Sequence, residues 1–291
     1  MTALVTGAGG FTGRYVVQAF SGAGYNVVGL ARGSVLQGRD NRVDLCDASQ
    51  VADALEGIDP DVVVHLAAVS SVAHGDVDEI YRVNVLGARN LLSVLAGKTN
   101  RPSRVLLAGT ANIYGNVERV IDEDTPFNPQ NDYAVSKLAM EYMARLWNDA
   151  LNITVVRPFN YTGVGQSARF LVPKIVDHFK RRAPTLELGN IDVVRDFNDV
   201  RNVAAAYLAL AEGGPPWESL NICSGKEYSI RNILDLLEQI TGYRPEIRIN
   251  PAFVRANDVK RLVGNPARLE GRMGRRVEFS MEETLRWMVA S

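Results

Sequence analysis

The chain has 291 residues, of which 46% are hydrophobic and 22% charged, and its formal net charge at pH 7 is −1. These values are typical of a soluble globular protein that buries its core in one large domain or two small ones. A near-neutral chain without a run of like charge excludes bulk electrostatic attraction to nucleic acid or to a membrane surface.

The two cysteines, Cys46 and Cys223, lie far apart and lack the spacing of metal ligands. This usage argues against a disulfide framework and a zinc site, and it fits a reducing compartment. A strand-like run begins at residue 2 and leaves no room for a signal peptide, and no apolar stretch approaches the ~18 residues of a membrane span. We therefore predict a cytoplasmic protein with no metal, membrane or nucleic-acid partner.

Apolar runs of strand length alternate with segments of helical period over the first two thirds of the chain. The runs are apolar nearly throughout, as expected of parallel strands that helices cover on both faces. The alternation predicts right-handed crossovers and a Rossmann-like, doubly wound parallel α/β sheet. The predicted strands are residues 3–5, 26–30, 61–67, 104–108 and 153–156, with a further short extended segment before Asp44, and the predicted helices are residues 12–20, 49–56, 78–95 and 133–148.

The first predicted turn follows a strand, opens a helix and spaces Gly7, Gly10 and Gly13 as G-x-x-G-x-x-G. Gly7 permits a tight turn, Gly10 lets the backbone approach a pyrophosphate, and Gly13 permits close packing of the helix on the strand. The helix N-terminus adds N–H donors and the positive end of its dipole. This turn therefore predicts that the protein binds a dinucleotide.

The tip of the second strand bears on the choice of cofactor. An acid there would favour NAD(H) and an arginine would favour NADP(H), and this chain has Arg32 with no acid at the tip. We expect NADP(H), with NAD(H) possible, and the alternative interpretation of Arg32 is a solvated turn residue. Asp44 is positioned to meet an adenine amino group, unless it is a helix N-cap or a turn acid.

Two later strands end in residues that suit a bound cofactor. The run Leu66-Ala67-Ala68 ends in small side chains that would let the backbone lie against a flat ligand, and we expect His65 at the edge of the core. Thr110 brings a hydroxyl to the carboxyl end of a central parallel strand, where ligands of such sheets bind. The alternative for Thr110 is an ordinary β-residue.

Tyr133 and Lys137 are four residues apart in a predicted helix, so they share one face. A phenol titrates near pH ~10, and a cation at about 4 Å lowers the pKa by up to roughly three units at an effective dielectric near 20. Desolvation of the phenol opposes this shift, which is therefore an upper bound. The alternative is a half-buried ring beside a lysine that reaches solvent.

These motifs together resemble the extended short-chain dehydrogenase/reductase family of nucleotide-sugar epimerases, dehydratases and reductases. The resemblance spans essentially the whole chain and includes the runs Thr110 to Gly115 and Arg157 to Asn160. It implies that Thr110, Tyr133 and Lys137 are the catalytic residues. By the same resemblance, the cofactor is contacted by Gly7, Gly10, Phe11, Gly13, Arg32, Asp44, Leu45, Leu66, Ala67, Ala68, Tyr133, Lys137 and Pro158.

The second half is similar to the branch of that family that contains GDP-mannose dehydratases and GDP-6-deoxy-mannose reductases. This similarity implies that Asn160, Arg195 and Arg255 hold a nucleotide diphosphate and that Asp258 meets the nucleotide ribose. Thr110 and Asn112 would then contact the sugar. The alternatives are a surface pair of Arg195 with Asp196 and a solvated Arg255.

Within the family, a 4,6-dehydratase needs ionisable groups directly after the catalytic threonine, and this chain has Ala111 and Asn112 there. We therefore expect NADPH-dependent reduction of a GDP-4-dehydro-6-deoxy-hexose, with GDP-4-dehydro-6-deoxy-D-mannose converted to GDP-D-rhamnose. The alternatives are a reductase that forms the 6-deoxy-talose epimer and a nucleotide-sugar 4-epimerase. A dinucleotide sensor and a reductase of small carbonyl compounds are less well supported by the same residues.

Two domains are expected. Residues 1–157, joined by about 199–222, would bind NADP(H), and residues 158–198 and 223–291 would form a smaller α/β domain that binds the nucleotide sugar. Ser280 and Glu283 form the capping-box pattern of a closing helix. The family resemblance further implies a homodimer built through the helices near 78–95 and 133–148.

Overall fold

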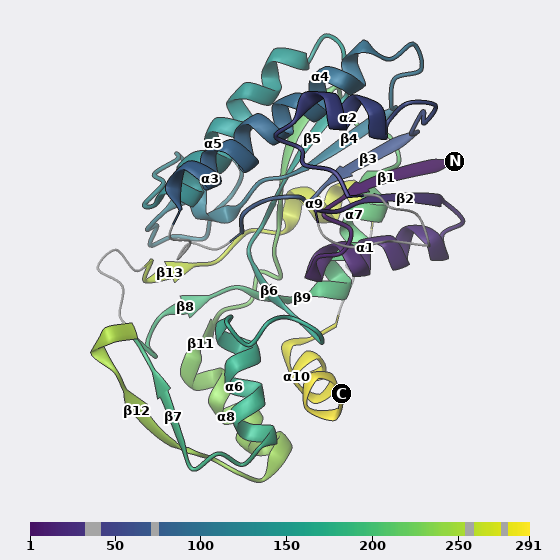
Figure 1. Cartoon of the computed structure of the whole chain (residues 1–291). Coiled ribbons are helices and arrows are strands. Elements are labelled where there is room, and N and C mark those ends of the chain that lie inside the picture. The colour runs from purple at the N-terminus through teal and green to yellow at the C-terminus, as the bar shows by residue number, and fades with distance from the viewer. Residues whose placement is uncertain (33–41, 71–75, 254–258, 275–278) are drawn as a thin grey trace.

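The computed structural model describes residues 1–32, 42–70, 76–253, 259–274 and 279–291. Its centre is a six-stranded sheet in the order β10-β5-β4-β3-β1-β2, and every neighbouring pair in it is parallel (Figure 1). The strands are β1 (Thr2–Thr6), β2 (Asn26–Leu30), β3 (Val62–His65), β4 (Arg104–Ala108), β5 (Ile153–Pro158) and β10 (Trp217–Ile222).

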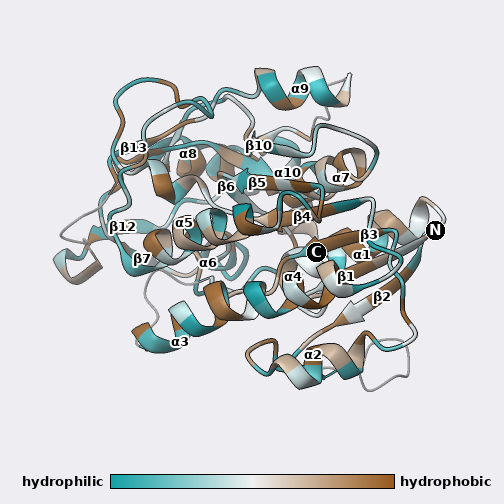
Figure 2. Ribbon diagram, turned by 90° about the horizontal axis from the view of Figure 1, so that it is seen from above, coloured by the Kyte–Doolittle hydropathy of each residue, from teal (hydrophilic) through white to brown (hydrophobic). Residues whose placement is uncertain are grey.

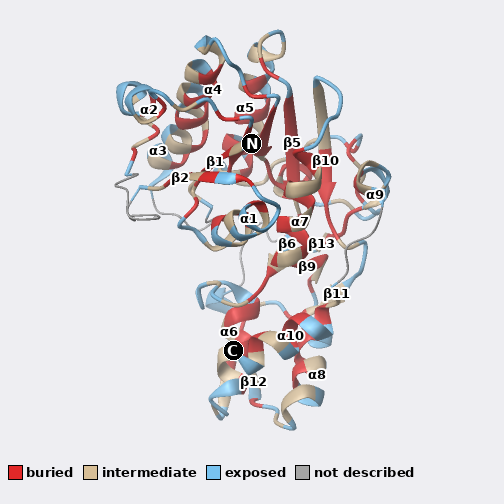
Figure 3. Ribbon diagram, turned by 90° about the vertical axis from the view of Figure 1, so that its right-hand side faces the viewer, coloured by how far each residue is buried: buried red, intermediate tan, exposed pale blue. Residues whose placement is uncertain are grey.

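Helices cover both faces of this sheet and bury a separate apolar cluster on each. On one face α1 and α7 pack on side chains such as Val5 and Leu106, and on the other α2, α4 and α5 pack on side chains such as Leu4 and Leu107. The strands are largely hydrophobic in Figure 2 and buried in Figure 3. The helical elements are α1 (Phe11–Gly22), α2 (Ala48–Ala54), α3 (Val77–Tyr81), the π-helix η1 (Arg82–Gly87), α4 (Ala88–Gly97), the 3-10 helix η2 (Ala111–Tyr114), α5 (Asp132–Ala144), the 3-10 helix η3 (Arg145–Trp147), α7 (Val200–Leu210) and α9 (Ala267–Met273).

The strand order determines where a ligand can meet the sheet. Strand β1 lies between β2 and β3, so the chain turns toward opposite edges of the sheet on the two sides of β1. Open α/β sheets bind ligands outside the carboxyl ends of their strands at such a switch point. Three predicted ligand segments therefore lie together at the carboxyl ends of the strands: the glycine turn after β1, the small residues after β3 and Thr110 after β4.

The predicted strands and helices are present, with differences that have physical causes. Strand β3 ends at His65, because the next residues leave the ladder for the ligand edge, and the segment before Asp44 forms only an isolated bridge between Ala31 and Arg42. The long helix predicted at residues 78–95 is interrupted by the π-helix η1, in which Asn84 is buried. The helix predicted at 133–148 ends as α5 followed by η3.

A second group of elements lies below the sheet in Figure 1 and has an apolar cluster of its own. Helices α6, α8 and α10 contribute most of that cluster, which includes Ile175, Ile233 and Leu285. The exact domain boundary stays a prediction. The elements are β6 (Asn160–Thr162), α6 (Leu171–Lys180), β7 (Thr185–Leu188), β8 (Val194–Arg195), β9 (Phe197–Asp199), β11 (Tyr228–Ser229), α8 (Ile230–Thr241), β12 (Glu246–Ile249), the 3-10 helix η4 (Pro251–Phe253), β13 (Arg261–Leu262) and α10 (Met281–Ala290).

The closing helix α10 has the predicted capping box, formed by Ser280 and Glu283. Its Thr284 hydroxyl donates to the buried carboxylate of Asp199 at 2.6 Å, which ties α10 to the start of α7. Asp199 also accepts from Arg201 at 2.7 Å. In the part of the chain that the structure describes, no helix is long and apolar enough to cross a membrane.

Candidate active site

The glycine turn joins β1 to α1 and is packed so closely that Gly7 and Gly13 have no room for a side chain. Gly7 has φ +70°, and a Cβ on it would lie 2.8 Å from the backbone nitrogen of Ala67. A Cβ on Gly13 would lie 2.1 Å from the carbonyl oxygen of Gly7. Gly10 is the N-cap of α1 and offers no side-chain cap, so the N–H groups of the first turn suit the diphosphate of a dinucleotide. The residues present therefore fit the predicted cofactor.

A hydrogen-bonded clip holds this turn against the end of β3. The Thr6 hydroxyl lies 2.8 Å from Nδ1 of His65 and accepts from the backbone N–H of Ala67 at 3.2 Å. His65 is buried, and burial together with the charge of Lys137 lowers its pKa to about 3. The imidazole is therefore neutral at working pH, as expected of a residue in the core. The clip also brings Ala67 to the position where it excludes a side chain at Gly7.

Thr110 and Tyr133 meet at the carboxyl end of β4. Thr110 is buried at the N-terminus of η2, where its hydroxyl accepts from the backbone N–H and the side-chain amide of Asn112 at 3.2 and 3.0 Å. The Tyr133 phenol, from the first turn of α5, lies near the Thr110 side chain. Burial raises the pKa of Tyr133 to about 12, and the nearby Thr110 hydroxyl only partly opposes that rise. The phenol is therefore protonated at neutral pH.

Lys137 lies one turn further along α5, and only 2% of its surface is exposed. Its ammonium donates to the carbonyl oxygen of Ala108 at 2.8 Å. Burial lowers the pKa of Lys137 to about 8, against the opposing charge of Glu141. The expectation that Lys137 lowers the pKa of Tyr133 is wrong for this arrangement, because desolvation of the ring dominates and the ammonium bonds to a backbone carbonyl.

A buried ion pair lies one helical turn after Lys137, on the same side of α5. Glu141, one turn after Lys137, binds Arg157 at 2.7 Å, and Arg157 also donates to the Tyr114 hydroxyl at 2.9 Å. Gly109 leaves room for this carboxylate, since a Cβ there would lie 2.7 Å from Oε1 of Glu141. Arg157 is thus occupied by the protein itself. Pro158, which follows it, ends β5 at the ligand edge of the sheet.

The predicted adenosine end of the cofactor lies beyond β2. Arg32 is exposed over 58% of its side chain and pairs with Glu79 of α3 at 2.6 Å. Arg32 is thus exposed but ion-paired. Asp44 accepts from the N–H of Cys46 at 3.0 Å and is a turn acid, while the N-cap of α2 is Asp47. Leu45, which follows Asp44 in the chain, is buried.

Of the four residues predicted to bind the nucleotide, the structure describes two. Asn160 is exposed on β6, and Arg195 on β8 donates to the carbonyls of Val194 and Lys260 at 3.0 and 3.3 Å. The alternative of a surface pair with Arg195 is wrong for Asp196, which is fully buried. Arg255 and Asp258 lie outside the described residues.

Asp196 holds the loop after β10. Its carboxylate accepts from the backbone and hydroxyl of Ser224 at 2.8 and 2.7 Å and from the N–H of Gly225 at 2.8 Å. Burial raises the pKa of Asp196, and these hydrogen bonds oppose the rise. Asp196 therefore has a structural role: it fixes the backbone next to Arg195 to the loop after β10.

Comparison with known proteins assigns the fold and the glycine turn to one family. The profile of the NAD dependent epimerase/dehydratase family matches residues 3–223. The chain belongs to this family. The membership confirms the resemblance predicted from the sequence, the Rossmann-like fold, and the use of a nicotinamide dinucleotide by an enzyme.

Two curated relatives of this family member cover nearly its whole length. The GDP-6-deoxy-D-talose 4-dehydrogenase of Aggregatibacter actinomycetemcomitans is 35% identical over 96% of this chain and 94% of its own. The GDP-6-deoxy-D-mannose reductase of Pseudomonas aeruginosa is 34% identical over 97% of this chain and 94% of its own. The solved structure of RMD from Pseudomonas aeruginosa complexed with NADPH has a TM-score of 0.86 and 31% identity, and covers 100% of this chain and 97% of that one.

One buried residue next to α5, Asn84, was not among the predicted site residues. Asn84 of η1 accepts from the N–H of Val69 at 2.8 Å and donates to the Ser136 hydroxyl at 3.0 Å, and Ser136 donates to the carbonyl of Tyr133 at 2.8 Å. The chain of bonds fixes the first turn of α5 relative to the loop after β3. The sequence signal for this role was a polar asparagine within a predicted helix. The π-helix itself could not be predicted, because one π-turn does not change the hydrophobic periodicity of the helix visibly.

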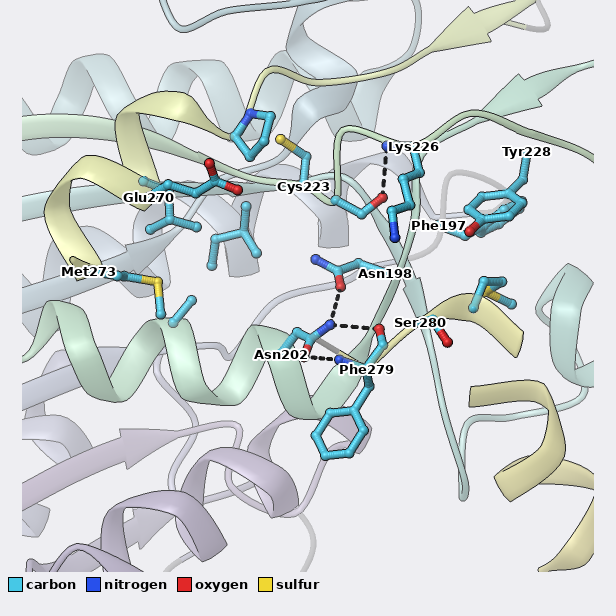
Figure 4. Close-up of a pocket in the computed structure, with 16 residues that line it drawn as sticks. Phe197, Asn198, Asn202, Cys223, Lys226, Tyr228, Glu270, Met273, Phe279 and Ser280 are labelled. Carbon is cyan, nitrogen blue, oxygen red and sulfur yellow. Dashed lines mark hydrogen bonds between the residues drawn. The ribbon is translucent and has the colours of Figure 1, made fainter. Parts of the chain in front are cut away.

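A small cavity of about 60 Å³ lies away from these residues (Figure 4). It is enclosed by the start of α7, by α9 and by the segment before α10, and Asn202 bonds there to Asn198 and Phe279. Binding pockets for small ligands measure roughly 300–1,000 Å³. This cavity is too small for a nucleotide, and none of Thr110, Tyr133 and Lys137 lines it.

Proposed function

We propose that this enzyme reduces the 4-keto group of a GDP-4-dehydro-6-deoxy-hexose with NADPH. The observation that carries the proposal is the placement of the Tyr133 phenol near Thr110 and one helical turn from Lys137, next to a glycine turn that fits a dinucleotide. The substrate that we favour is GDP-4-dehydro-6-deoxy-D-mannose, and the product is GDP-D-rhamnose. The reductase relative and the complex of RMD with NADPH support this choice.

Each of the three side chains has one task in this reaction. Bound NADPH supplies a hydride to C4 of the sugar. Tyr133 donates its proton to the oxygen that becomes the hydroxyl, and its raised pKa keeps that proton available at neutral pH. Thr110 orients the carbonyl oxygen by a hydrogen bond, and the Lys137 ammonium would hold the nicotinamide ribose of the bound cofactor.

The same surroundings argue against a dehydratase. Expulsion of the C6 hydroxyl requires a group that removes the C5 proton. The two residues after Thr110 are Ala111, which is buried, and Asn112, whose amide donates to the Thr110 hydroxyl at 3.0 Å. Neither side chain exchanges protons.

For the nucleotide diphosphate we propose Asn160, Arg195 and Arg255 as ligands, and for the nucleotide ribose Asp258. Asn160 lies in β6 and Arg195 in β8. Both strands follow β5, in the part of the chain between the central sheet and the apolar cluster of α6, α8 and α10. A guanidinium forms two parallel bonds to phosphate oxygens, which suits a diphosphate. Because Asp196 anchors the loop after β10, the backbone that carries Arg195 is held in place without a ligand.

The preference for NADPH over NADH rests on Arg32. Its guanidinium lies at the tip of β2, where a 2′-phosphate of bound NADP(H) would be placed. Glu79 pairs with it at 2.6 Å, so the phosphate competes with this carboxylate for the guanidinium. NAD(H) is a second possible cofactor in this proposal, although β2 has no acid at its tip to bind the adenosine ribose of NAD(H).

The proposal is tested by supplying GDP-4-dehydro-6-deoxy-D-mannose with NADPH or NADH. Loss of reduced-nicotinamide absorbance and recovery of GDP-D-rhamnose, identified by NMR, is the expected result. Rapid turnover of GDP-mannose without added cofactor would contradict the exclusion of a dehydratase. Failure of the protein to bind GDP by calorimetry would overturn the assignment of the substrate class.

The second candidate forms or oxidises the C4 epimer, GDP-6-deoxy-D-talose. The relative at 35% identity carries that activity in its name and is as similar to this chain as the reductase is. The face of C4 that meets the cofactor distinguishes the two. Incubation of GDP-6-deoxy-D-talose and of GDP-D-rhamnose with NADP⁺ compares them directly, and reduction of NADP⁺ by the talose compound alone would favour this candidate.

We also propose that the enzyme is a homodimer through α5. Val135 and Tyr142 of α5 and Leu146 of the following η3 are exposed by 39, 54 and 78%, and their spacing puts them on one side of this helical segment. Leu86 of the adjacent η1 is exposed as well. A second copy that presents the same face would cover these side chains. Sedimentation velocity of the wild type and of Leu146→Glu tests this, with a dimer and a monomer as the expected results.

A further inference from the structure

The first turn of α1 is bonded directly to the segment that carries Asn160. The hydroxyl oxygens of Thr12 and Tyr161 lie 2.7 Å apart, and the rings of Phe11 and Tyr161 stack at 6.2 Å with planes 12° apart. Thr12 is the second residue of α1, and Tyr161 follows Asn160 in β6. One phenol therefore touches both the turn that fits the dinucleotide and the strand assigned to the substrate.

The contact is local to the first turn of α1. One turn further, Tyr15 donates from its hydroxyl to the carbonyl of Val164 at 2.7 Å, and Arg14 donates to the carbonyl of Gly165 at 3.2 Å. Those two bonds tie α1 to the loop after β6, whereas the bond from Thr12 reaches β6 itself. The pairing of Tyr161 with Asn198 in β9 then connects β6 to the strand next to Arg195 and Asp196.

We propose that Tyr161 is a positioning residue through which a dinucleotide bound at the first turn of α1 favours binding of the nucleotide sugar beside Asn160. The inference rests on the proposed function, because it takes the cofactor and substrate sites from there. A bound diphosphate immobilises the first turn and, through Thr12 and Tyr161, also β6. The second ligand then meets a strand that is already ordered, so its own ordering cost is smaller.

The test measures GDP binding by calorimetry with and without saturating NADP⁺, using the whole chain. We expect the wild type to bind GDP on the order of 5-fold more tightly when NADP⁺ is present. Tyr161→Phe removes only the hydroxyl and should bring this factor close to one while GDP alone binds as before. Thr12→Val removes the same bond from the other side, and the double variant should match each single variant.

Tyr15→Phe is the matched control, because it removes another 2.7 Å hydroxyl bond between the same helix and the same segment. It should retain the wild-type factor. A wild-type factor of one, or a Tyr161→Phe protein that binds both nucleotides with the wild-type factor, would overturn the inference and leave the proposed reaction untouched. Failure of the wild type to bind either nucleotide would overturn both.

Discussion

The Lys137 ammonium donates to the carbonyl oxygen of Ala108 at 2.8 Å, two residues before Thr110. This bond holds the lysine in the interior near Thr110, although burial lowers its pKa to about 8. A buried ammonium destabilises the fold, and in the proposed reaction it also acts on the cofactor. The cost and the chemistry lead to separate predictions.

Lys137→Met should stabilise the folded protein at pH 7. The pKa of Lys137 is about 8 in the fold and 10.5 in the unfolded chain, a difference worth roughly 3 kcal/mol in free energy of unfolding. The penalty is complete below pH 8, where both states are charged, and it disappears as the pH rises toward 10.5. Urea denaturation at pH 7 and pH 9.5 should therefore show a larger gain at pH 7, and a gain independent of pH would contradict the account.

The pH dependence of catalysis should follow Lys137 too. In the free enzyme, kcat/KM for NADPH should fall as the pH rises through about 8, because a neutral amine holds the nicotinamide ribose less strongly than the ammonium does. Tyr133, with a pKa of about 12, and His65, with a pKa of about 3, add no further transition in the working range. In Lys137→Arg the residual activity should lack this transition, since a guanidinium stays charged.

Tyr133→Phe should bind NADPH with wild-type affinity and lose turnover by on the order of 10²- to 10⁴-fold, the usual contribution of a general acid. Binding is measured by fluorescence of the reduced nicotinamide, and turnover by its absorbance. Tyr142→Phe is the control, because it alters an exposed phenol on the same helix. Retained turnover in Tyr133→Phe would contradict the proposed proton donation and leave the Tyr133 ring with a packing role alone.

Gly13→Ala should separate α1 from β1. The new Cβ would lie 2.1 Å from the carbonyl oxygen of Gly7, so the helix must shift, at a cost of about 1–3 kcal/mol in stability. NADPH binding should weaken in parallel. Gly22→Ala, at the other end of α1, meets nothing within 4 Å and should be neutral or stabilising by up to about 1 kcal/mol. Equal melting temperatures for the two variants would refute the packing role of Gly13.

Arg32→Ala should raise the KM for NADPH roughly 10-fold and leave the KM for NADH nearly unchanged, because only NADPH carries the 2′-phosphate. Glu79→Gln releases Arg32 from its ion pair and should lower the KM for NADPH by about two- to five-fold. Steady-state kinetics with both cofactors measures these effects. An equal change in the KM for NADPH and for NADH in Arg32→Ala would contradict the proposal that Arg32 binds the 2′-phosphate.

Much of the ligand edge could be predicted because its signals are local. The spacing of Gly7, Gly10 and Gly13 reports a turn that has to be tight, and strand-length apolar runs report a sheet covered on both faces. The helical spacing of Tyr133 and Lys137 puts both on one face of α5 whatever packs around them. Residues a few positions apart are enough to specify such features.

Protonation states and polar partners depend instead on groups far away in the chain. Burial raises the pKa of Tyr133, where the helical spacing had led us to expect a decrease, and Asp196 holds a loop near residue 224. Asn84 reaches Ser136 across 52 positions, and Thr12 reaches Tyr161 across 149. Spacing along the chain thus predicted the fold, and it put Tyr133 and Lys137 on one face of α5. Desolvation and long-range contacts, which arise only when the chain is folded, determine the protonation of these side chains and the residues that hold them in place.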